Sequence, residues 1–410
     1  MRKVLLLALG SFTLGLDAYV MAGLLPAIAD DTGTAVALAG QLVTAFTLAY
    51  AVSAPLFAGL LSGRGPRAAL IGALALFTVA NALTALAPTF ALLLLARVVA
   101  GAGAGLYSAL STAAASSMVP AERRGRALAL VMGGMSTGTV LGVPLGVLLA
   151  EHTGWRATLW LVTALGAIAL SGLAVLLPPM PSMPRAARIP ARERLAVVAD
   201  RAVAPVIAVS FFAAVASLGL YTYLAPVLES AGGVHEVSPY LWAWGVGGVL
   251  GSVLVGPLVD RGGRVLLLVG SVLALIALAQ ALLPALASVP LAAGLALVVW
   301  GAGGWALQVP QQHRLLALRP DRGPVVLALN NSALYLGSAV GSALGGLALA
   351  AGLAPYVLPW IAAGVAALGL LLHALTAVRV PSGTAGGATS APEPQLTGPT
   401  LGTLGNHEHS

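Results

Sequence analysis

Long apolar segments separated by short polar loops follow one another along most of the chain. A transmembrane helix needs about 20 consecutive apolar residues. Twelve such segments can be placed before the composition turns to Gly, Ser, Thr and Pro at about residue 381. The pattern predicts an all-α membrane protein with spans at 4–25, 37–60, 67–87, 90–112, 127–150, 157–178, 204–228, 239–258, 264–285, 290–311, 324–348 and 354–378.

The longest internal loop, 179–203, is rich in Pro and Arg and divides the twelve spans into two sets of six. We therefore expect an N-terminal six-helix bundle at 1–178, a linker loop at 179–203 and a C-terminal six-helix bundle at 204–380. The polar region 381–410 is expected to be a disordered tail.

Composition agrees with a membrane protein, because 59% of the residues are hydrophobic and only 8% are charged. Soluble proteins carry roughly 25% charged residues. The net charge of +7 does not indicate nucleic-acid binding, since its distribution along the chain has another explanation.

If both termini lie in the cytoplasm, 18 of the 20 basic residues fall in cytoplasmic segments. The exceptions are Arg156, in an outer loop, and Arg97, inside a span. Such a bias follows the positive-inside rule. With a wrong number of spans, the basic loops would fall on both sides of the membrane. The outer loops are instead expected to carry the acids Asp30, Asp31, Glu151, Glu229 and Glu236.

The chain has no cysteine and no phosphate-binding loop of the G-x-x-x-x-G-K-[ST] type. Neither a cysteine metal site nor ATP is therefore expected. We expect no cofactor and no metal, and an ion gradient as the energy source.

The fifth predicted span has a stripe of small residues, with glycine at every fourth position. Residues four apart lie on one face of a helix. In a membrane, such a stripe lets a second helix approach to backbone contact. Pro144 removes a backbone donor, so we also expect a kink there. The stripe consists of Gly134, Gly138, Gly142 and Gly146.

The two halves share a loop sequence. Residues 59–67 read GLLSGRGPR and residues 256–264 read GPLVDRGGR, which gives five identities in nine positions at an offset of 197. Each copy follows the second span of its half. A repeated six-helix unit is typical of alternating-access transporters with a site at the bilayer midplane.

These features together resemble the major facilitator superfamily, in particular its twelve-helix drug:proton antiporter branch, over nearly all of residues 1–380. Residues 256–264 match the superfamily's G-x-L-x-D-R-x-G-R loop, residues 95–105 its helix 4 motif with an intramembrane arginine, and residues 134–146 its antiporter motif. Residues 15–26 and 330–337 resemble helices 1 and 11 of bacterial drug exporters, including chloramphenicol exporters and sugar-efflux relatives.

The resemblance implies gating and helix-packing roles for the loop and stripe residues. The 59–67 copy departs from the motif, because Gly63 stands where an acid is expected and Pro66 where a glycine is expected. The gate contact would then be weaker or held by the second copy. Besides the stripe and Pro144, the candidates are Arg64, Arg67, Gly256, Asp260, Arg261 and Arg264.

Asp17 and Arg97 are ionisable residues placed well inside predicted spans, and such residues are functional by default. At roughly 1.5 Å per residue, both lie about 10–12 Å below the outer surface. A change in their separation or hydration would change the proton affinity of Asp17. Three arrangements stay open: a proton switch, a static buried ion pair, and no contact between the two.

Polar and aromatic residues inside the spans are candidates for substrate binding. Interhelical hydrogen bonds and interfacial aromatics are the alternative for each one singly. The candidates are Gln41, Tyr50, Asn81, Tyr107, Tyr221, Tyr223, Trp305, Gln308, Asn330, Asn331 and Tyr335.

This inventory favours a proton-coupled exporter of small lipophilic compounds, for which chloramphenicol-like antibiotics are plausible cargo. Efflux of a sugar or another small metabolite is the alternative. An intramembrane enzyme would need clustered acids or histidines at one depth, which the spans lack, so no catalytic residue is expected. The expected partners are a small-molecule substrate and membrane lipid, and the resemblance implies a monomer in the bacterial inner membrane.

Overall fold

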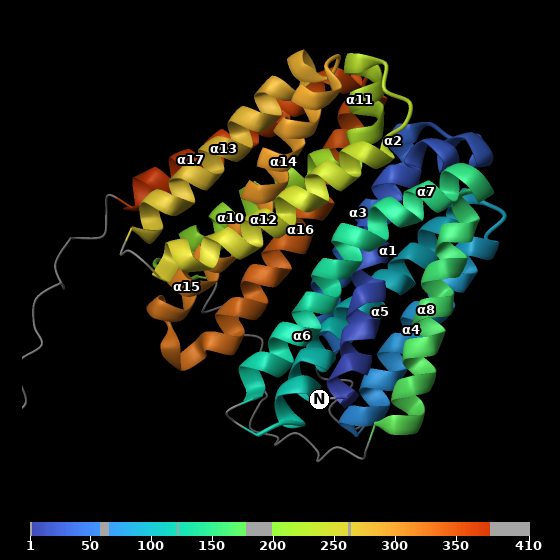
Figure 1. Cartoon of the computed structure of the whole chain (residues 1–410), viewed down its shortest axis with the longest axis vertical. Helices are drawn as coiled ribbons and strands as arrows, with labels where there is room; N and C mark the ends of the chain where they lie inside the picture. The colour runs from blue at the N-terminus through green and yellow to red at the C-terminus, as the bar shows by residue number, and fades with distance from the viewer. Residues whose placement is uncertain (1, 58–64, 121–122, 178–198, 261–263, 378–410) are drawn as a thin grey trace, which may run out of the picture.

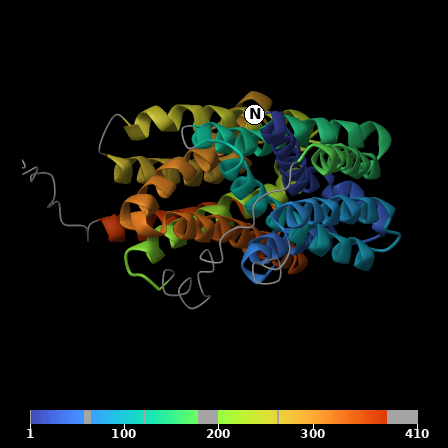
Figure 2. The same cartoon turned by 90° about the horizontal axis from the view of Figure 1, so that it is seen from below.

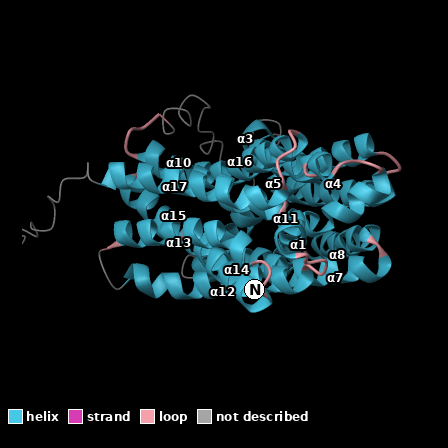
Figure 3. Cartoon of the chain, turned by 90° about the horizontal axis from the view of Figure 1, so that it is seen from above, coloured by secondary structure: helices cyan, strands magenta, loops and turns pink. Residues whose placement is uncertain are grey.

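The computed structural model describes residues 2–57, 65–120, 123–177, 199–260 and 264–377. These residues form helices and connecting loops, as Figure 3 shows. Twelve helices are long and apolar enough to cross a membrane. The predicted fold class and the predicted number of spans are therefore confirmed. The predicted tail 381–410 and most of the predicted linker lie outside the described residues.

The first six spans pack together in one half of the molecule (Figure 1). The fifth span is divided into α6 and α7 by a π-helical segment, Gly138–Gly142. The elements of this half are α1 (Arg2–Thr32), α2 (Val36–Ala39), α3 (Gln41–Phe57), α4 (Pro66–Leu86), α5 (Phe90–Ser117), α6 (Arg124–Thr137), α7 (Val143–Thr153) and α8 (Trp155–Leu176).

The other six spans form the second half. Short 3₁₀ turns at Pro320–Arg322 and Pro355–Val357 precede its last two spans. The elements are α10 (Val203–Thr222), α11 (Leu224–Gly232), α12 (Ser238–Asp260), α13 (Val265–Leu286), α14 (Pro290–Ala306), α15 (Gln308–Leu318), α16 (Gly323–Ala350) and α17 (Leu358–Ala377).

Several helices extend beyond their predicted apolar segments. α1 continues to Thr32, so Asp30 and Asp31 lie in its last turn rather than in a loop. Glu151 and Glu229 likewise lie within α7 and α11. Hydropathy marks the length of chain that suits lipid, whereas a helix continues into the aqueous layer for as long as its backbone hydrogen bonds are made.

The two halves approach each other away from the N-terminus, and their ribbons diverge toward the end where the N-terminus lies (Figure 1). Figure 2 shows the two halves side by side from that end. Contacts between them include Gly40, which follows α2, against the hydroxyl of Tyr223. Ser238 Oγ donates a hydrogen bond of 3.5 Å to the Pro144 carbonyl oxygen. The halves therefore meet from the centre of the molecule to the end opposite the N-terminus.

The glycine stripe packs against α1 in one continuous register. Each glycine lies against the α1 residue 126 positions earlier, so the two helices run in parallel with matched turns. A Cβ atom on Gly142 would lie 3.1 Å from that of Leu16, and one on Gly146 would lie 2.9 Å from Val20 Cγ2. The pairs are Gly134 with the Ala8 carbonyl oxygen, Gly138 with the Phe12 carbonyl oxygen, Gly142 with Leu16, and Gly146 with Val20.

Near Pro144 the helix changes type, and the expected kink stays a prediction. The π-helical segment Gly138–Gly142 ends just before α7, and Pro144 lies in the first turn of α7. A missing backbone N–H is tolerated at that position. Single π turns inside α-helices are frequent at functional sites.

Candidate functional site

Asp17 of α1 and Arg97 of α5 form an ion pair inside the N-terminal half. Arg97 Nη1 donates to both carboxylate oxygens, at 2.8 Å to Oδ1 and 3.0 Å to Oδ2. Both residues have 0% exposure to solvent. The structure thus excludes the arrangement without contact that the sequence left open.

Two further side chains complete the surroundings of the pair. Asn81 of α4 donates to Asp17 Oδ2 at 3.4 Å, and its own Oδ1 accepts from Arg97 Nη1 at 3.4 Å. The guanidinium carbon of Arg97 lies 4.2 Å from the centroid of the Phe46 ring, a cation–π contact. The pair therefore joins α1, α3, α4 and α5 around one buried carboxylate.

This arrangement has two charge states. With Asp17 ionised, the carboxylate balances the guanidinium and the pair is neutral. A proton on Asp17 cancels the negative charge, weakens the charge-assisted hydrogen bonds and leaves the Arg97 charge unbalanced in a buried place. Proton uptake at this carboxyl group can therefore change the helix packing around it.

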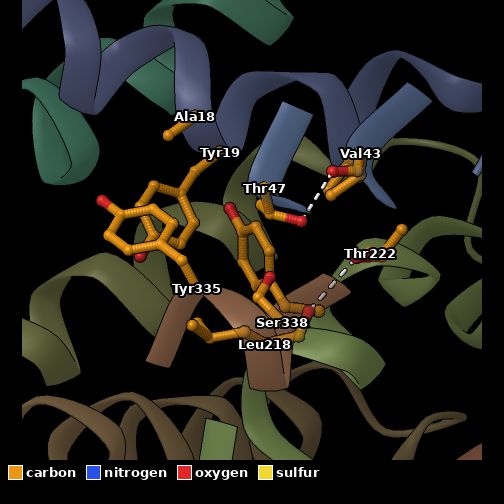
Figure 4. A pocket seen from close by; sticks show the side chains of 10 residues that line it. Ala18, Tyr19, Val43, Thr47, Leu218, Thr222, Tyr335 and Ser338 are labelled. Carbon is orange, nitrogen blue, oxygen red and sulfur yellow. Dashed lines mark hydrogen bonds between the residues drawn. The ribbon is translucent and has the colours of Figure 1, made fainter. Parts of the chain in front are cut away.

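A small cavity lies between the two halves, beside α1 (Figure 4). It encloses about 10 Å³, about enough for one ordered water molecule. Helices α1 and α3 line it on one side, and helices α10 and α16 on the other. The lining residues are Ala18, Tyr19, Ala22, Val43, Thr47, Leu218, Tyr221, Thr222, Tyr335 and Ser338.

Aromatic rings surround this cavity. Tyr19 meets Tyr221 edge to face, with ring centroids 6.0 Å apart. Trp244 lies next to both rings, with its ring centroid 4.4 Å from that of Tyr221 and 6.2 Å from that of Tyr19. Tyr335 stacks on Tyr50 across the two halves, with centroids 3.6 Å apart.

The family model of the Major Facilitator Superfamily matches residues 7–342. The chain belongs to the major facilitator superfamily. The expected resemblance is thereby confirmed, and the protein is a secondary transporter with twelve transmembrane helices.

Relatives and solved structures agree with this family. The chain is 34% identical over 388 residues to the inner membrane transport protein YdhP of Escherichia coli K12, covering 92% of this chain and 96% of the relative. It is 32% identical over 339 residues to a chloramphenicol resistance protein of Streptomyces lividans, covering 82% and 86%. A D-xylose–proton symporter matches with a TM-score of 0.72 and 18% identity, covering 90% of this chain and 96% of the symporter. Twelve apolar helices and inner-membrane relatives indicate a multi-pass protein of the bacterial inner membrane.

Within this major facilitator fold, the predicted substrate residues separate into two groups. Tyr221 and Tyr335 line the central cavity, and Tyr50 stacks on Tyr335. Asn81 belongs to the ion pair instead. Tyr107 is fully buried in the N-terminal half, where its hydroxyl donates to the Leu7 carbonyl oxygen at 3.0 Å.

The remaining candidates lie outside the cavity lining. Gln41 and Tyr223 pack where the halves meet, each against Gly346. Trp305 lies 6.4 Å from Trp244, ring to ring. Gln308 is half-buried at the start of α15, Asn331 is exposed on α16, and the buried Asn330 has an Oδ1 atom without a hydrogen-bond partner among the described residues.

Sequence reasoning missed several cavity residues, among them Tyr19, Thr47 and Ser338. Tyr19 follows Asp17 by two positions, which turns it to another face of α1. A signal was present, because a tyrosine two residues from an intramembrane acid is itself a polar group inside a span. Thr47 and Ser338 gave no signal, since Ser and Thr are common in transmembrane helices as packing residues.

The C-terminal half has a neutral counterpart of the ion pair. Gln280 of α13 donates to the Ala216 carbonyl oxygen at 3.1 Å, and Trp300 Nε1 of α14 donates to Ser217 Oγ at 2.7 Å. These bonds join α10 to α13 and α14, as Asp17 joins α1 to α4 and α5. The polar chemistry at this position is therefore ionic in the first half and uncharged in the second.

Among the described spans, the buried carboxyl group is that of Asp17 and the buried imidazole is that of His373, in α17. His373 is therefore the second side chain to consider for proton binding. Its Nε2 lies 2.8 Å from the Leu266 carbonyl oxygen, and its Nδ1 lies 3.3 Å from Arg314 Nη1. A ring that donates to the carbonyl and accepts from the arginine is neutral. A proton on Nδ1 would displace the Arg314 contact and place two cations together.

The predicted gating residues are described only in part. Arg67 Nη2 donates to the Ala174 carbonyl oxygen at 2.6 Å, which ties the start of α4 to the end of α8. Gly256 lies in α12, Asp260 is the last residue of that helix, and Arg264 is exposed before α13. Arg64 and Arg261 lie outside the described residues.

Proposed function

We propose that this transporter exports small lipophilic compounds in exchange for protons, by alternating access of a central site between its two halves. One observation carries the proposal: α1 presents the Asp17 carboxylate to the ion pair on one face and Tyr19 to the central cavity on another. A movement of α1 that follows protonation therefore changes the cavity wall. Coupling of proton and cargo needs such a shared element.

The cycle follows from the two charge states of the pair. With the site open to the outside, Asp17 takes a proton, and the Arg97 contact weakens. After the halves rearrange, the proton leaves to the cytoplasm, the ion pair forms again, and cargo binds. A static pair that only orients helices is the competing hypothesis.

The direction of access follows from the positive-inside rule, which places both termini in the cytoplasm. The halves meet at the end opposite the N-terminus, so with the N-terminus in the cytoplasm this arrangement would be an inward-facing state that is closed on the outer side. The gating loops at 59–67 and 256–264 would then lie at the cytoplasmic surface. A monomer in contact with membrane lipid suffices for this cycle.

Lipophilic cargo is supported by the aromatic cavity wall and by the relative named as a chloramphenicol resistance protein. Sugar or metabolite efflux remains the second candidate, because hydroxyl groups of Thr47, Thr222 and Ser338 line the same cavity. A sugar site requires many hydrogen-bonding groups from both halves. The aromatic content of this site favours the lipophilic compound.

The test uses inside-out membrane vesicles with an acidic lumen and a lumenal pH indicator. Chloramphenicol and a panel of other lipophilic antibiotics are added outside, which is the cytoplasmic face. We expect compound-dependent loss of protons from the lumen with the wild-type protein and none with Asp17→Asn.

Asp31→Asn is the matched control, because Asp31 also pairs with an arginine, Arg156, but at the surface, where the two side chains are 41% and 39% exposed. This control should keep the response. A response that persists in Asp17→Asn removes the proton site from α1, and a wild-type protein that moves sugars but none of these compounds supports the second candidate.

A further inference from the structure

The central cavity has a definite chemical character. None of its ten lining residues is charged, although the residue before Ala18 is an aspartate. The Asp17 carboxylate is directed instead into the N-terminal half, where Arg97 and Asn81 bind both of its oxygens. The acid is therefore separated from any molecule in the cavity.

Three hydroxyl groups of the lining form no hydrogen bond with the described residues: those of Tyr19, Tyr221 and Ser338. Other lining hydroxyls are already engaged. Thr47 donates to the Val43 carbonyl oxygen at 2.8 Å, and Thr222 lies 2.6 Å from Ser342 Oγ. Each free hydroxyl can both donate and accept, so the three suit a ligand with neutral polar groups.

The rings beside these hydroxyls suit a flat apolar group. Tyr19 and Tyr221 meet edge to face, and Trp244 packs on both. Aromatic pairs in such geometry gain energy beyond the area that they bury. Because the cavity now holds only about one water molecule, the rings must part when the two halves move to admit cargo.

We infer that the cargo is an uncharged molecule that combines an aromatic ring with hydroxyl or amide groups, and that the free tyrosine hydroxyls select it. This inference rests on the proposed function and specifies its substrate class. A cation would lie in the cavity without a counter-ion, and a proton on Asp17 would leave the Arg97 charge to repel it. An anion would equally lack a partner, since Arg97 faces the ion pair.

Tyrosine rings can also attract a cation, so the opposite result has a physical basis. The experiment therefore compares three compounds with one p-nitrophenyl-propanediol core. The 2-amino compound is cationic at pH 6, its N-acetyl amide is neutral, and its N-succinyl amide is anionic. Binding to the purified full-length protein in lipid nanodiscs is followed by equilibrium dialysis.

We expect the neutral amide to bind at least about 10-fold more tightly than either charged compound. Tyr19→Phe and Tyr221→Phe keep the rings but lose the free hydroxyls, and each should weaken binding of the neutral amide about 2- to 10-fold. Tyr356→Phe is the control, because Tyr356 is exposed and lies before α17. This variant should bind the amide as tightly as the wild-type protein does.

Equal or tighter binding of the amine, a preference for the succinyl amide, or binding of none of the three overturns the inference. Failure of the proposed function gives a different pattern. Selective binding of the neutral amide without proton release in vesicles would leave the inference standing and end the antiport proposal. Proton release driven by the amine would support the antiport proposal and overturn the inference.

Discussion

The rings of Tyr50 and Tyr335 stack across the two halves, with centroids 3.6 Å apart and planes inclined by 20°. Tyr50 belongs to α3 and Tyr335 to α16, so the stack joins helices that the proposed alternating access would move relative to each other. Tyr335 also lines the cavity. The contact therefore holds the halves together at the level of the central site.

A double-mutant cycle measures this stack. Tyr50→Ala and Tyr335→Ala should each lower the free energy of unfolding in detergent, with a coupling of about 0.5–1.5 kcal/mol between them. Tyr50→Phe keeps the stacked ring, so it should lower the free energy of unfolding far less than Tyr50→Ala does. Strictly additive effects of the two alanine changes would show that the stack does not contribute.

The glycine stripe gives a second prediction. A Cβ atom on Gly138 would overlap the carbonyl oxygen of Phe12, whereas one on Gly133 meets nothing within 4 Å. Gly138→Ala should therefore push α1 away from the π-helical segment and lower the free energy of unfolding by about 1–3 kcal/mol. Gly133→Ala should leave stability unchanged or raise it slightly, since alanine favours helix. Equal stability of the two variants in thermal melts would mean that the helices are not in backbone contact.

The Asp17–Arg97 pair gives a third prediction, which compares the stability of a single and a double variant. Arg97→Ala leaves the Asp17 carboxylate buried without its partner, which typically costs about 3–5 kcal/mol. Adding Asp17→Asn removes that charge, so the double variant should be more stable than Arg97→Ala alone. Denaturant unfolding in micelles measures both, and a double variant less stable than Arg97→Ala would show that the carboxylate is not held by charge pairing.

On the proposed mechanism, one proton is exchanged per cycle, because the position that Asp17 occupies in the first half is taken in the second half by the neutral bonds of Gln280 and Trp300. Exchange of one proton for one uncharged molecule moves a net charge. Export should then be driven by membrane potential even at equal pH. In inside-out vesicles, a lumen-positive potential set with potassium and valinomycin should drive uptake of the neutral amide; uptake that ignores the potential would contradict a one-to-one exchange.

Asp200, just before α10, gives a prediction about pH. The backbone N–H of Ala202 donates to its carboxylate at 2.9 Å, and with the Arg319 ion pair this holds the pKa of Asp200 below its ordinary value. The bonds therefore stabilise the folded state above the ordinary aspartate pKa, about 3.9, and the benefit is lost as pH falls through the lower folded value. Asp200→Asn should lower the melting temperature by roughly 1–3 °C at pH 7 and by less near pH 3. A deficit that grows as pH falls would contradict this account.

Much of the fold could be predicted from the sequence, because a membrane-spanning helix must have a minimum length and an apolar composition, and both are visible in the hydropathy of the chain. Counting residues from the span ends also placed Asp17 and Arg97 at one depth, and the structure shows them in contact. The breaks at Gly40, Tyr223 and Leu307 were not predicted, since each lies inside a segment that was predicted to be one continuous span.

The candidate site was harder to predict, because a polar side chain inside a span serves packing and binding equally well. Asn81 and Tyr107 were selected for substrate and instead bond Asp17 and the Leu7 carbonyl oxygen. Tyr19 was missed, although it faces the cavity. Which face of a helix meets the other half depends on the packing of all twelve helices, which one sequence does not show.

The central claim, that Asp17 carries the proton exchanged for cargo, has one most direct measurement. Purified protein in weakly buffered detergent solution is mixed with the neutral amide over a series of pH values, and the protons released are counted with a pH indicator. The account expects release in the wild type and in Asp31→Asn, approaching one proton per bound molecule at its maximum, and none in Asp17→Asn. Equal release from Asp17→Asn and the wild type would contradict it.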